Sequence, residues 1–183
     1  MGADQEHLWV LGARKGDERC FARLVEAYQV PVYNLAYRML GSSTEAEDAA
    51  QETFLRVFRR LNTYDESRKL SSWILSIASH YCIDRLRKRR GGLVSMEEIQ
   101  SWRWVPDQGA RPEDTTLEVE ASQDMQAMLA ALPAQYRLVI VLRYWQELSY
   151  AEISEITGAS VSAVKSRLHR ARELVATKIA ERE

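Results

Sequence analysis

Cysteine, proline and glycine are scarce in this chain of 183 residues, which holds two, four and eight of them respectively. Because Cys20 and Cys82 lie far apart and form no CxxC motif, neither a disulfide framework nor a zinc site is predicted. The few prolines and glycines favour helices over many short strands. No apolar run approaches the roughly eighteen residues of a membrane-spanning helix, and Leu8 to Leu11 is too short for a signal-peptide core. We therefore expect a cytoplasmic protein with no membrane insertion.

An excess of charge of either sign is also missing over the whole chain, since 25 Lys and Arg residues face 26 Asp and Glu residues. This average conceals segments of opposite charge. Residues 56–90 contain ten basic and three acidic side chains, whereas residues 91–136 contain two basic and eight acidic ones. Residues 1–55 are acidic overall, and residues 137–183 are weakly basic. Near-neutrality therefore does not exclude a protein that binds nucleic acid.

Apolar residues recur at helical spacing from Asp17 to Arg90, which predicts three or four packed helices. Ser43 is expected to cap one of them, which is acidic in its first half and carries arginines in its last turn. A further helix is predicted from about Ser72 to the basic run at residues 85–90. Between these two helices, residues 62–71 have the composition of a turn.

The stretch from Gly91 to about Ser122 contains two prolines and is acidic overall. It is too long for an ordinary loop inside one domain, so we interpret it as a linker. Trp102 and Trp104 within it have two interpretations: they dock on a neighbouring helix, or they mark a surface for a partner protein. The predicted division of the chain is a first domain, a linker and a second domain, at residues 1–91, 92–122 and 123–183.

The C-terminal segment has the pattern of two helices joined by a tight turn. Ser149 and Glu152 form a capping box at the start of a short helix, and Gly158 provides the turn that follows. Ser160 or Ser162 is expected to cap a longer last helix. A short helix, a turn with glycine and a second helix with basic and small polar residues are typical of a helix-turn-helix.

Within this motif, Val161 and Val164 are expected to pack with Ile153 and Ile156. The polar and basic residues of the last helix then share the opposite face at steps of three and four, where a major groove can meet them together. These residues are Ser162, Lys165, Ser166, His169 and Arg170. The alternative interpretation is a solvated, charged face on a C-terminal helix.

The basic run at residues 85–90 indicates a second binding surface, because Trp73, His80 and Tyr81 lie on the same predicted helix. Aromatic and basic side chains together suit stacking on exposed bases and pairing with phosphates. The alternative interpretation is a solvated helix end, which the helix dipole favours for basic residues.

Three separated segments resemble, in the same order, the extracytoplasmic-function sigma factors, the compact two-domain class of bacterial sigma factors. They are DAAQETFLRVFRRL, SSWILSIASHYCIDRLRKRR and LPAQYRLVIVLRYWQELSYAEISEITGASVSAVKSRLHRAR. The resemblance covers nearly the whole chain apart from the linker and the extreme ends. It implies an all-α fold of two small helical domains joined by a flexible linker, with a sigma region 2 bundle first and the helix-turn-helix of sigma region 4 second.

The resemblance also implies the function of a transcription initiation factor that binds core RNA polymerase and promoter DNA. Region 2 is implied to bind the polymerase, read the −10 element and open the duplex, and region 4 to read the −35 element. The loop at residues 62–71 corresponds to a pocket that captures a flipped −10 base. An anti-sigma factor is a further implied partner, and neither a cofactor nor a metal is expected.

By position, the resemblance assigns three sets of residues. The polymerase-binding set is Asp48, Gln51, Glu52 and Leu55. The −10 set is Asn62, Tyr64, Arg68, Lys69, Trp73, His80, Asp84, Arg85 and Lys88. The −35 set is Ser162, Lys165, Ser166, Arg167, His169 and Arg170.

Two departures from the family pattern affect these sets. Many members have Ala-Arg-Asn before the aspartate of the −10 helix, whereas residues 78–80 here are Ala-Ser-His, which alters phosphate pairing or base preference. Ser162 and Ala163 replace a common glycine and threonine at the start of the −35 helix, which bears on the bases that are read. Asp84 has a structural interpretation as well, as the i,i+4 partner of Lys88.

Two other classes of protein compete with this interpretation. A one-component helix-turn-helix regulator would need an effector pocket or a dimer interface, and it leaves the basic run at residues 85–90 unexplained. An enzyme is disfavoured, because the sequence shows no Ser/His/Asp set, no nucleotide-binding loop and no metal cluster. Its three histidines, His7, His80 and His169, are scattered along the chain.

Overall fold

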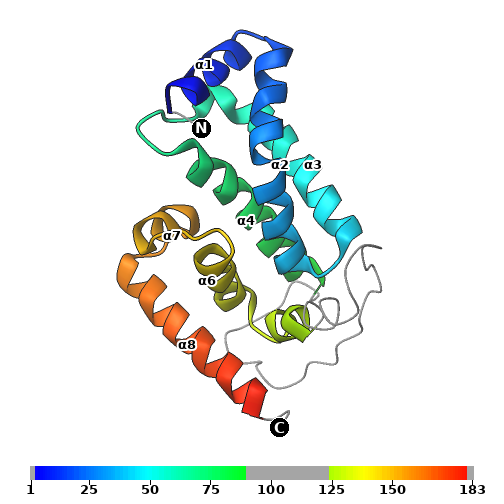
Figure 1. The fold of residues 1–183 in the computed structure, drawn as a ribbon, viewed down its shortest axis with the longest axis vertical. Coiled ribbons are helices and arrows are strands. Elements are labelled where there is room, and N and C mark those ends of the chain that lie inside the picture. The colour runs from blue at the N-terminus through cyan, green and yellow to red at the C-terminus, as the bar shows by residue number, and fades with distance from the viewer. Residues whose placement is uncertain (1–2, 90–123, 181–183) are drawn as a thin grey trace.

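A computed structural model of the chain describes residues 3–89 and 124–180, and every regular element within these ranges is helical. The helices form two bundles that lie against each other (Figure 1). The first bundle contains α1 (Ala3–Arg14), α2 (Glu18–Leu40), α3 (Ser43–Arg60), the short 3-10 helix η1 (Leu61–Thr63) and α4 (Leu70–Arg89). The second contains a helical segment at residues 124–130, α6 (Ala134–Tyr144), α7 (Tyr150–Thr157) and α8 (Val161–Ala180). The predicted all-α class with two helical units is confirmed.

Local chemistry sets the helix ends of the first bundle. Asp17 caps α2, since its carboxylate accepts hydrogen bonds from two backbone N–H groups of the first turn. The helix ends at Gly41, whose φ of 81° lies in the left-handed region that favours glycine. Ser42 then caps α3 by accepting a hydrogen bond from the N–H of Glu45. The predicted cap, Ser43, is instead the first residue of the helix.

Large side chains of α2 and α4 carry the core of the first bundle. Leu35, Met39 and Ile74 are fully buried, and Cys82 lies in the same core. Burial raises the pKa of the Cys82 thiol to about 12, so the thiol stays protonated and unreactive. α4 begins at Leu70, two residues before the predicted start, because Leu70 is itself a buried core residue.

The second bundle contains the predicted helix-turn-helix. The hydroxyl of Ser149 accepts a hydrogen bond from the N–H of Glu152, whose carboxylate accepts one from the N–H of Ser149, so the capping box is confirmed. Gly158 ends α7 with a φ of 67°, as the turn requires. Ser160 caps α8, since its hydroxyl accepts a hydrogen bond from the N–H of Ala163 at 3.2 Å.

The packing of this motif follows the predicted pattern with one exception. Ile153, Ile156 and Val164 are completely buried between α7 and α8. Val161 is 40% exposed, so its predicted packing with the two isoleucines is wrong. It is the first residue of α8 and lies at the free end of the helix, one turn before the face that reaches the core.

The sequence pattern does not predict how the two bundles meet. α4 packs against α7 and α6, and α2 packs against α6 (Figure 1). The predicted linker at residues 92–122, with Trp102 and Trp104, lies outside the described residues. Within the part of the chain that is described, no helix combines the length and the apolar character that a membrane crossing requires.

Candidate nucleic-acid and polymerase interfaces

The last helix, α8, presents most of the predicted −35 residues to solvent. The exposed members are Ser162, Lys165, Ser166, His169 and Arg170, and Arg167 is half-buried. Their spacing by three and four places the exposed members on one side of the helix. His169 and Arg170 each lie near the carboxylate of Glu173, at 3.6 and 3.1 Å. The helix therefore carries hydroxyl and basic groups on one open face, which suits base edges in a major groove.

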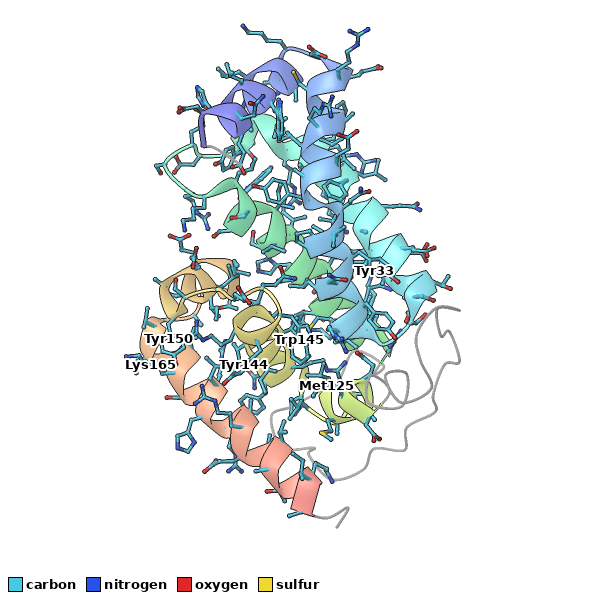
Figure 2. The ribbon with its side chains drawn as sticks, in the orientation of Figure 1. Tyr33, Met125, Tyr144, Trp145, Tyr150 and Lys165 are labelled. Atoms are coloured by element: carbon cyan, nitrogen blue, oxygen red, sulfur yellow. The ribbon has the colours of Figure 1, made fainter. Side chains whose placement is uncertain are left out.

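Tyr150 contacts Lys165, the first basic residue of this face. The Lys165 ammonium lies 5.9 Å from the centroid of the Tyr150 ring, and the Arg143 guanidinium lies 5.2 Å from the same centroid (Figure 2). Such cation–π contacts restrict an ammonium on an otherwise flexible stem. No sequence signal points to Tyr150, because the first residue of α7 is not expected to touch the second turn of α8.

A second tyrosine lies further along α8. Arg172 donates a hydrogen bond from Nε to the hydroxyl of Tyr144 at 2.9 Å. This bond raises the pKa of Arg172, so its charge is secure. The contact links the end of α6 to the fourth turn of α8, and it fixes the orientation of the recognition helix on its bundle.

An apolar hollow of about 420 Å³ lies between residues 124–130, α6 and α8, with Met125 in its wall (Figure 2). Its walls are almost entirely hydrocarbon, so it suits an apolar side chain of another molecule and not a polar cofactor. Across residues 3–89 and 124–180, no three His, Cys, Asp or Glu side chains are grouped so that they could hold a metal ion.

The predicted −10 surface begins at Trp73, whose ring packs against Tyr64 with their centroids 5.1 Å apart. Tyr64 is only 9% exposed, and its hydroxyl donates a hydrogen bond to the carbonyl of Arg68. Burial raises the pKa of Tyr64, so this donor stays protonated. In this arrangement Tyr64 presents no free face to a base and instead supports Trp73, which is half-buried.

The middle of α4 carries exposed residues on successive turns. His80, Asp84 and Lys88 all reach solvent. The ring of His80 is held by its Nδ1, which lies 2.6 Å from the carbonyl oxygen of Ser76. Asp84 pairs with Arg87 at 3.4 Å, so the predicted i,i+4 contact is replaced by an i,i+3 contact. Lys88 therefore remains on the exposed face without this carboxylate.

Other basic residues of α4 are engaged within the first bundle. Arg85 lies 3.2 Å from the carboxylate of Glu45 on α3, and Arg89 pairs with the same carboxylate. Arg89 also donates a hydrogen bond to the carbonyl of Leu40 at the end of α2, at 3.1 Å. Part of the +7 charge of residues 56–90 is therefore neutralised inside the fold.

Arg14 of α1 anchors the loop that precedes α4. Its guanidinium donates hydrogen bonds to the carbonyls of Leu61 and Tyr64 at 3.1 and 2.6 Å, and it pairs with Glu66. Asn62 of this loop is exposed. The sequence does not reveal this role, because an arginine in the last turn of a helix is equally explained by the helix dipole.

Two predicted −10 residues contact the second bundle. The Lys69 ammonium lies 2.7 Å from the carboxylate of Glu152, and Arg68 donates a hydrogen bond to the carbonyl of Glu155 at 3.4 Å. The bond to Glu152 raises the pKa of Lys69. The same bond, with those from Ser149, lowers the pKa of Glu152 to about 2. Both partners are therefore charged at neutral pH.

The predicted polymerase-binding residues lie on one side of α3. Asp48, Gln51 and Leu55 are exposed at steps of three and four. Glu52 is half-buried because it pairs with Arg56 at 2.7 Å. The structure thus brings this set together as a surface with acidic and apolar members.

Phe58 extends this α3 surface by one turn beyond Leu55. The two side chains are 57% and 50% exposed, which is unusual for large apolar residues in a folded chain. The ring of Phe58 rests edge-to-face on Phe21 of α2, with the centroids 5.1 Å apart. Its place three residues after Leu55 is the sequence signal that identifies it.

Two family models match the chain in the order of the two bundles. Sigma-70 region 2 matches residues 24–91, and Sigma-70 region 4 matches residues 122–175. The first match covers most of α2 with all of α3 and α4, and the second covers the helices of the second bundle through most of α8. The fold and these matches define a sigma factor built from region 2 and region 4.

Relatives narrow this class further. The chain is 40% identical over 166 residues to the ECF RNA polymerase sigma factor SigW of Bacillus subtilis, covering 87% of this chain and 89% of SigW. Two solved structures share its fold at 22% identity. CnrH in complex with the cytosolic domain of CnrY has a TM-score of 0.74 over the whole of both chains, and RpoE in complex with the anti-sigma factor NepR from Bartonella quintana has 0.68 over 87% and 96%. The chain belongs to the ECF RNA polymerase sigma factors, which initiate transcription at promoters.

Proposed function

We propose that this chain binds core RNA polymerase through α3 and directs it to promoters whose two elements are read by separate bundles. The observation that carries the proposal is the presence of one DNA-suited surface on each bundle, in a chain that belongs to a transcription initiation family. The division proposed is residues 1–91, the linker 92–122 and residues 123–183. The role involves no catalytic step by the chain itself, and it places the protein in the cytoplasm with the chromosome.

The α8 face is proposed to read the −35 element. Lys165 and Arg170 offer donors for the acceptor edge of guanine, and the hydroxyls of Ser162 and Ser166 bond to bases or phosphates. Arg167 is half-buried and better placed for backbone contacts. The exposure and spacing of this face support the proposal, because a recognition helix must present its side chains together.

The α4 surface and its preceding loop are proposed to read and open the −10 element. Opening DNA without ATP requires that binding energy offset the lost base pairs, and stacking on an aromatic contributes roughly 1–3 kcal/mol per base. Trp73 offers a part-exposed aromatic ring, which is backed by Tyr64. His80 and Lys88 then lie along the exposed side of α4, where they suit the phosphates of the strand.

The exposed side of α3 is proposed to bind the polymerase. Leu55 and Phe58 provide an apolar centre, and Asp48 provides charge at its edge, which is the usual anatomy of a specific protein interface. An anti-sigma factor is proposed as a second partner of the chain. The support for it is the likeness in fold to RpoE, whose structure contains the anti-sigma factor NepR.

Run-off transcription with purified core polymerase and the purified chain tests this function. We expect promoter-specific transcripts from fragments of the source genome, and their absence on every fragment would overturn the proposal. Leu55→Asp combined with Phe58→Asp is expected to abolish capture of core polymerase in a pull-down. Leu8→Asp is the matched control, because Leu8 is a similarly exposed apolar residue on α1. Equal capture by both variants would remove α3 from the interface.

A further inference from the structure

Arg14 of α1 holds the backbone of the loop before α4 at two points. Its Nε donates a hydrogen bond to the carbonyl of Leu61 at 3.1 Å, and its Nη2 donates one to the carbonyl of Tyr64 at 2.6 Å. Its Nη1 pairs with the carboxylate of Glu66. The donors of a guanidinium keep a fixed relative geometry, so bonds to three acceptors fix the acceptors relative to one another. One side chain therefore sets the path of residues 61–66.

The two bonded carbonyls flank Asn62 and Thr63, which are both exposed. The hydroxyl of Thr63 is used inside the loop, because it donates a hydrogen bond to the carbonyl of Arg60 at 2.8 Å. The side-chain amide of Asn62 has no hydrogen-bond partner among residues 3–89 and 124–180. Because an amide carries donors and an acceptor, it can distinguish the hydrogen-bonding edges of different bases. Asn62 is therefore a free reading group between two fixed points of the backbone.

We infer that Arg14 is a positioning residue for −10 recognition, which fixes the backbone on both sides of Asn62 and so determines how sharply the loop distinguishes between bases. The inference rests on the function proposed above, in which this loop takes part in reading the −10 element. Arg14 acts through Asn62, since its own donors are occupied by the loop. An amide held in place before DNA arrives accepts a matching base at low cost, whereas a mobile amide also adapts to a wrong one.

α1 is fixed on α2 at both of its ends, so it can serve as the base of this clamp. A Cβ added at Gly12 would collide with the Sγ of Cys20, which means that the last turn of α1 rests directly on the first turn of α2. Near the start of α1, the hydroxyl of Tyr28 donates a hydrogen bond to the carboxylate of Glu6 at 2.7 Å. Arg14 therefore extends from a helix that is already held in place.

α1 lies outside the residues that match the Sigma-70 region 2 model, which are 24–91. It nevertheless packs on η1, which begins the loop. A second side chain of α1 also reaches the loop, because Nδ1 of His7 lies 3.1 Å from the carboxylate of Glu66 that Arg14 binds. By this inference, the part of the chain that reads the −10 element begins at α1.

Two simpler roles for Arg14 lead to different predictions. If Arg14 only stabilises the fold, its loss reduces the amount of active protein but leaves the choice between bases unchanged. If Arg14 only attracts phosphates by its charge, lysine can replace it, and loss of a neighbouring cation has the same effect. Lys15 is such a cation, because it is exposed and follows Arg14 directly. The choice between bases therefore separates a positioning role from both alternatives.

The test compares four variants in run-off transcription with core polymerase: Arg14→Ala, Arg14→Lys, Asn62→Ala and the matched control Lys15→Ala. The templates carry each of the four bases at every −10 position of a promoter that the unsubstituted chain recognises. The discrimination ratio is the transcript from the preferred base divided by that from the next-best base, at the position where Asn62→Ala lowers it most. Both transcripts come from one protein preparation at limiting concentration, so a smaller folded fraction cancels from the ratio.

We expect Arg14→Ala to lower the discrimination ratio at least about fivefold, which is the lower end of the range for one base contact. Arg14→Lys should lower it to a similar extent, because lysine lacks the planar fork of donors. Lys15→Ala should leave it unchanged. Arg14→Ala combined with Asn62→Ala should lose no more than Asn62→Ala alone, since both changes act on one contact. Capture of core polymerase should be equal in all variants.

Hydrogen exchange provides a measurement that does not depend on transcription. Within the loop, the N–H of Tyr64 donates to the carbonyl of Leu61 at 3.2 Å, and the N–H of Arg68 donates to that of Asp65 at 3.1 Å. Without Arg14 these bonds should open more often, so the amides of residues 61–69 should exchange at least about tenfold faster in Arg14→Ala. The amides of α3 should change little, and Lys15→Ala should resemble the unsubstituted chain.

Five results would overturn the inference: no effect of Asn62→Ala at any −10 position, an unchanged ratio in Arg14→Ala, a full ratio in Arg14→Lys, an equal fall in Lys15→Ala, or unchanged exchange of the loop in Arg14→Ala. Failure of the proposed function has a different signature. In that case the unsubstituted chain itself gives no promoter-specific transcript, and the role in base choice falls with the function. The exchange measurement then still reports whether Arg14 holds the loop.

Discussion

The two surfaces proposed to meet promoter DNA differ in what they touch within the chain. On α8, Lys165, Ser166 and Arg170 stand on an exposed helix face, and the helix packs on α6 and α7 of its own bundle. On region 2, Trp73 packs on Tyr64, and Lys69 is paired with Glu152 of the second bundle. The −35 surface is thus preformed, whereas the −10 surface is engaged within the fold.

This difference matches the two tasks. A recognition helix docks on duplex DNA as a rigid body, so a preformed face saves the cost of ordering it. Melting the −10 element requires contacts that form only with the separated strand, so a part of its surface need not stand free beforehand. The following experiments are ordered by the size of the effect expected on this contrast.

The largest effect is expected from Arg137→Ala, which removes a hydrogen-bond donor that both bundles share. Arg137 belongs to α6 and caps the C-terminal end of α2 by donating to the carbonyl of Met39. It also donates to the carbonyls of Ala130 and Leu132 in its own bundle, at 2.8 and 3.2 Å. Leaving buried carbonyls unpaired should lower the free energy of unfolding by about 3 kcal/mol. Urea unfolding measures this change in the free energy of unfolding. Arg23→Ala, at an exposed ion pair, is the control and should change it by less than about 0.5 kcal/mol. Equal values for both variants would show that this cap is absent in solution.

The cap that Gln126 and Arg137 form on the end of α2 could not be predicted from the sequence. The capping box of Ser149 and the turn at Gly158 are predictable, because the chemistry that decides them lies within four residues. Gln126 and Arg137 bind carbonyls 89 and 98 residues away, and any helix end can accept such bonds. A lone polar residue in an apolar stretch therefore predicts a buried partner without identifying it.

The exposed faces were more accessible to prediction than the contacts behind them. The spacing of α8 predicts its open face, and it fails only for Val161, whose burial depends on where the helix begins. The burial of Tyr64 escapes prediction because Arg14 and Trp73, which enclose it, come from separate helices. Periodicity specifies which side of a helix is apolar, but not which loop residue the neighbouring helices cover.

Trp73→Ala is expected to impair promoter opening more than initial promoter binding. Loss of one stacking platform corresponds to roughly 1–3 kcal/mol, or about 5- to 150-fold in the extent of opening. Permanganate reactivity of the −10 thymines measures this opening, and a band-shift assay at low temperature measures binding. Trp73→Phe keeps an aromatic ring and should lose less. Wild-type reactivity in the alanine variant would remove Trp73 from the −10 surface.

Arg170→Ala should weaken transcription that depends on the −35 element while leaving polymerase binding intact. One lost contact to a base is expected to cost about 1–3 kcal/mol, and the preference at one −35 position should relax. Transcription from a promoter set with single −35 substitutions measures both effects. Arg23→Ala serves again as an exposed arginine outside the surface. An equal loss of polymerase capture would assign Arg170 to the polymerase interface instead.

Tyr150→Leu tests whether the preformed face depends on support from α7. The cation–π contact with Lys165 is worth about 0.5–1 kcal/mol at an exposed site, so −35-dependent transcription should fall about two- to fivefold. Tyr150→Phe keeps the ring and should retain most of the activity. In a Lys165→Ala background, the leucine substitution should have no further effect. Additive losses would show that Tyr150 acts independently of Lys165.

The smallest effect is expected from a change of pH, which acts on the ion pair between Lys69 and Glu152. Hydrogen bonds from Lys69 and Ser149 lower the pKa of Glu152 to about 2, and the bond to Glu152 raises the pKa of Lys69. A lowered carboxyl pKa gives stability that is complete above the ordinary value of 4.5 and is lost as pH falls toward 2. A raised ammonium pKa gives stability that is complete below 10.5 and is lost above it. Energy transfer between dyes on cysteines introduced at Ser67 and Ala151, in a Cys20→Ser background, should therefore stay constant from about pH 5 to 10 and begin to fall outside these limits. Glu152→Gln preserves the capping-box geometry but not the charge, so its acid-side decline should be smaller. A decline of the same size in both proteins would mean that other carboxylates, and not the Lys69–Glu152 pair, respond to acid.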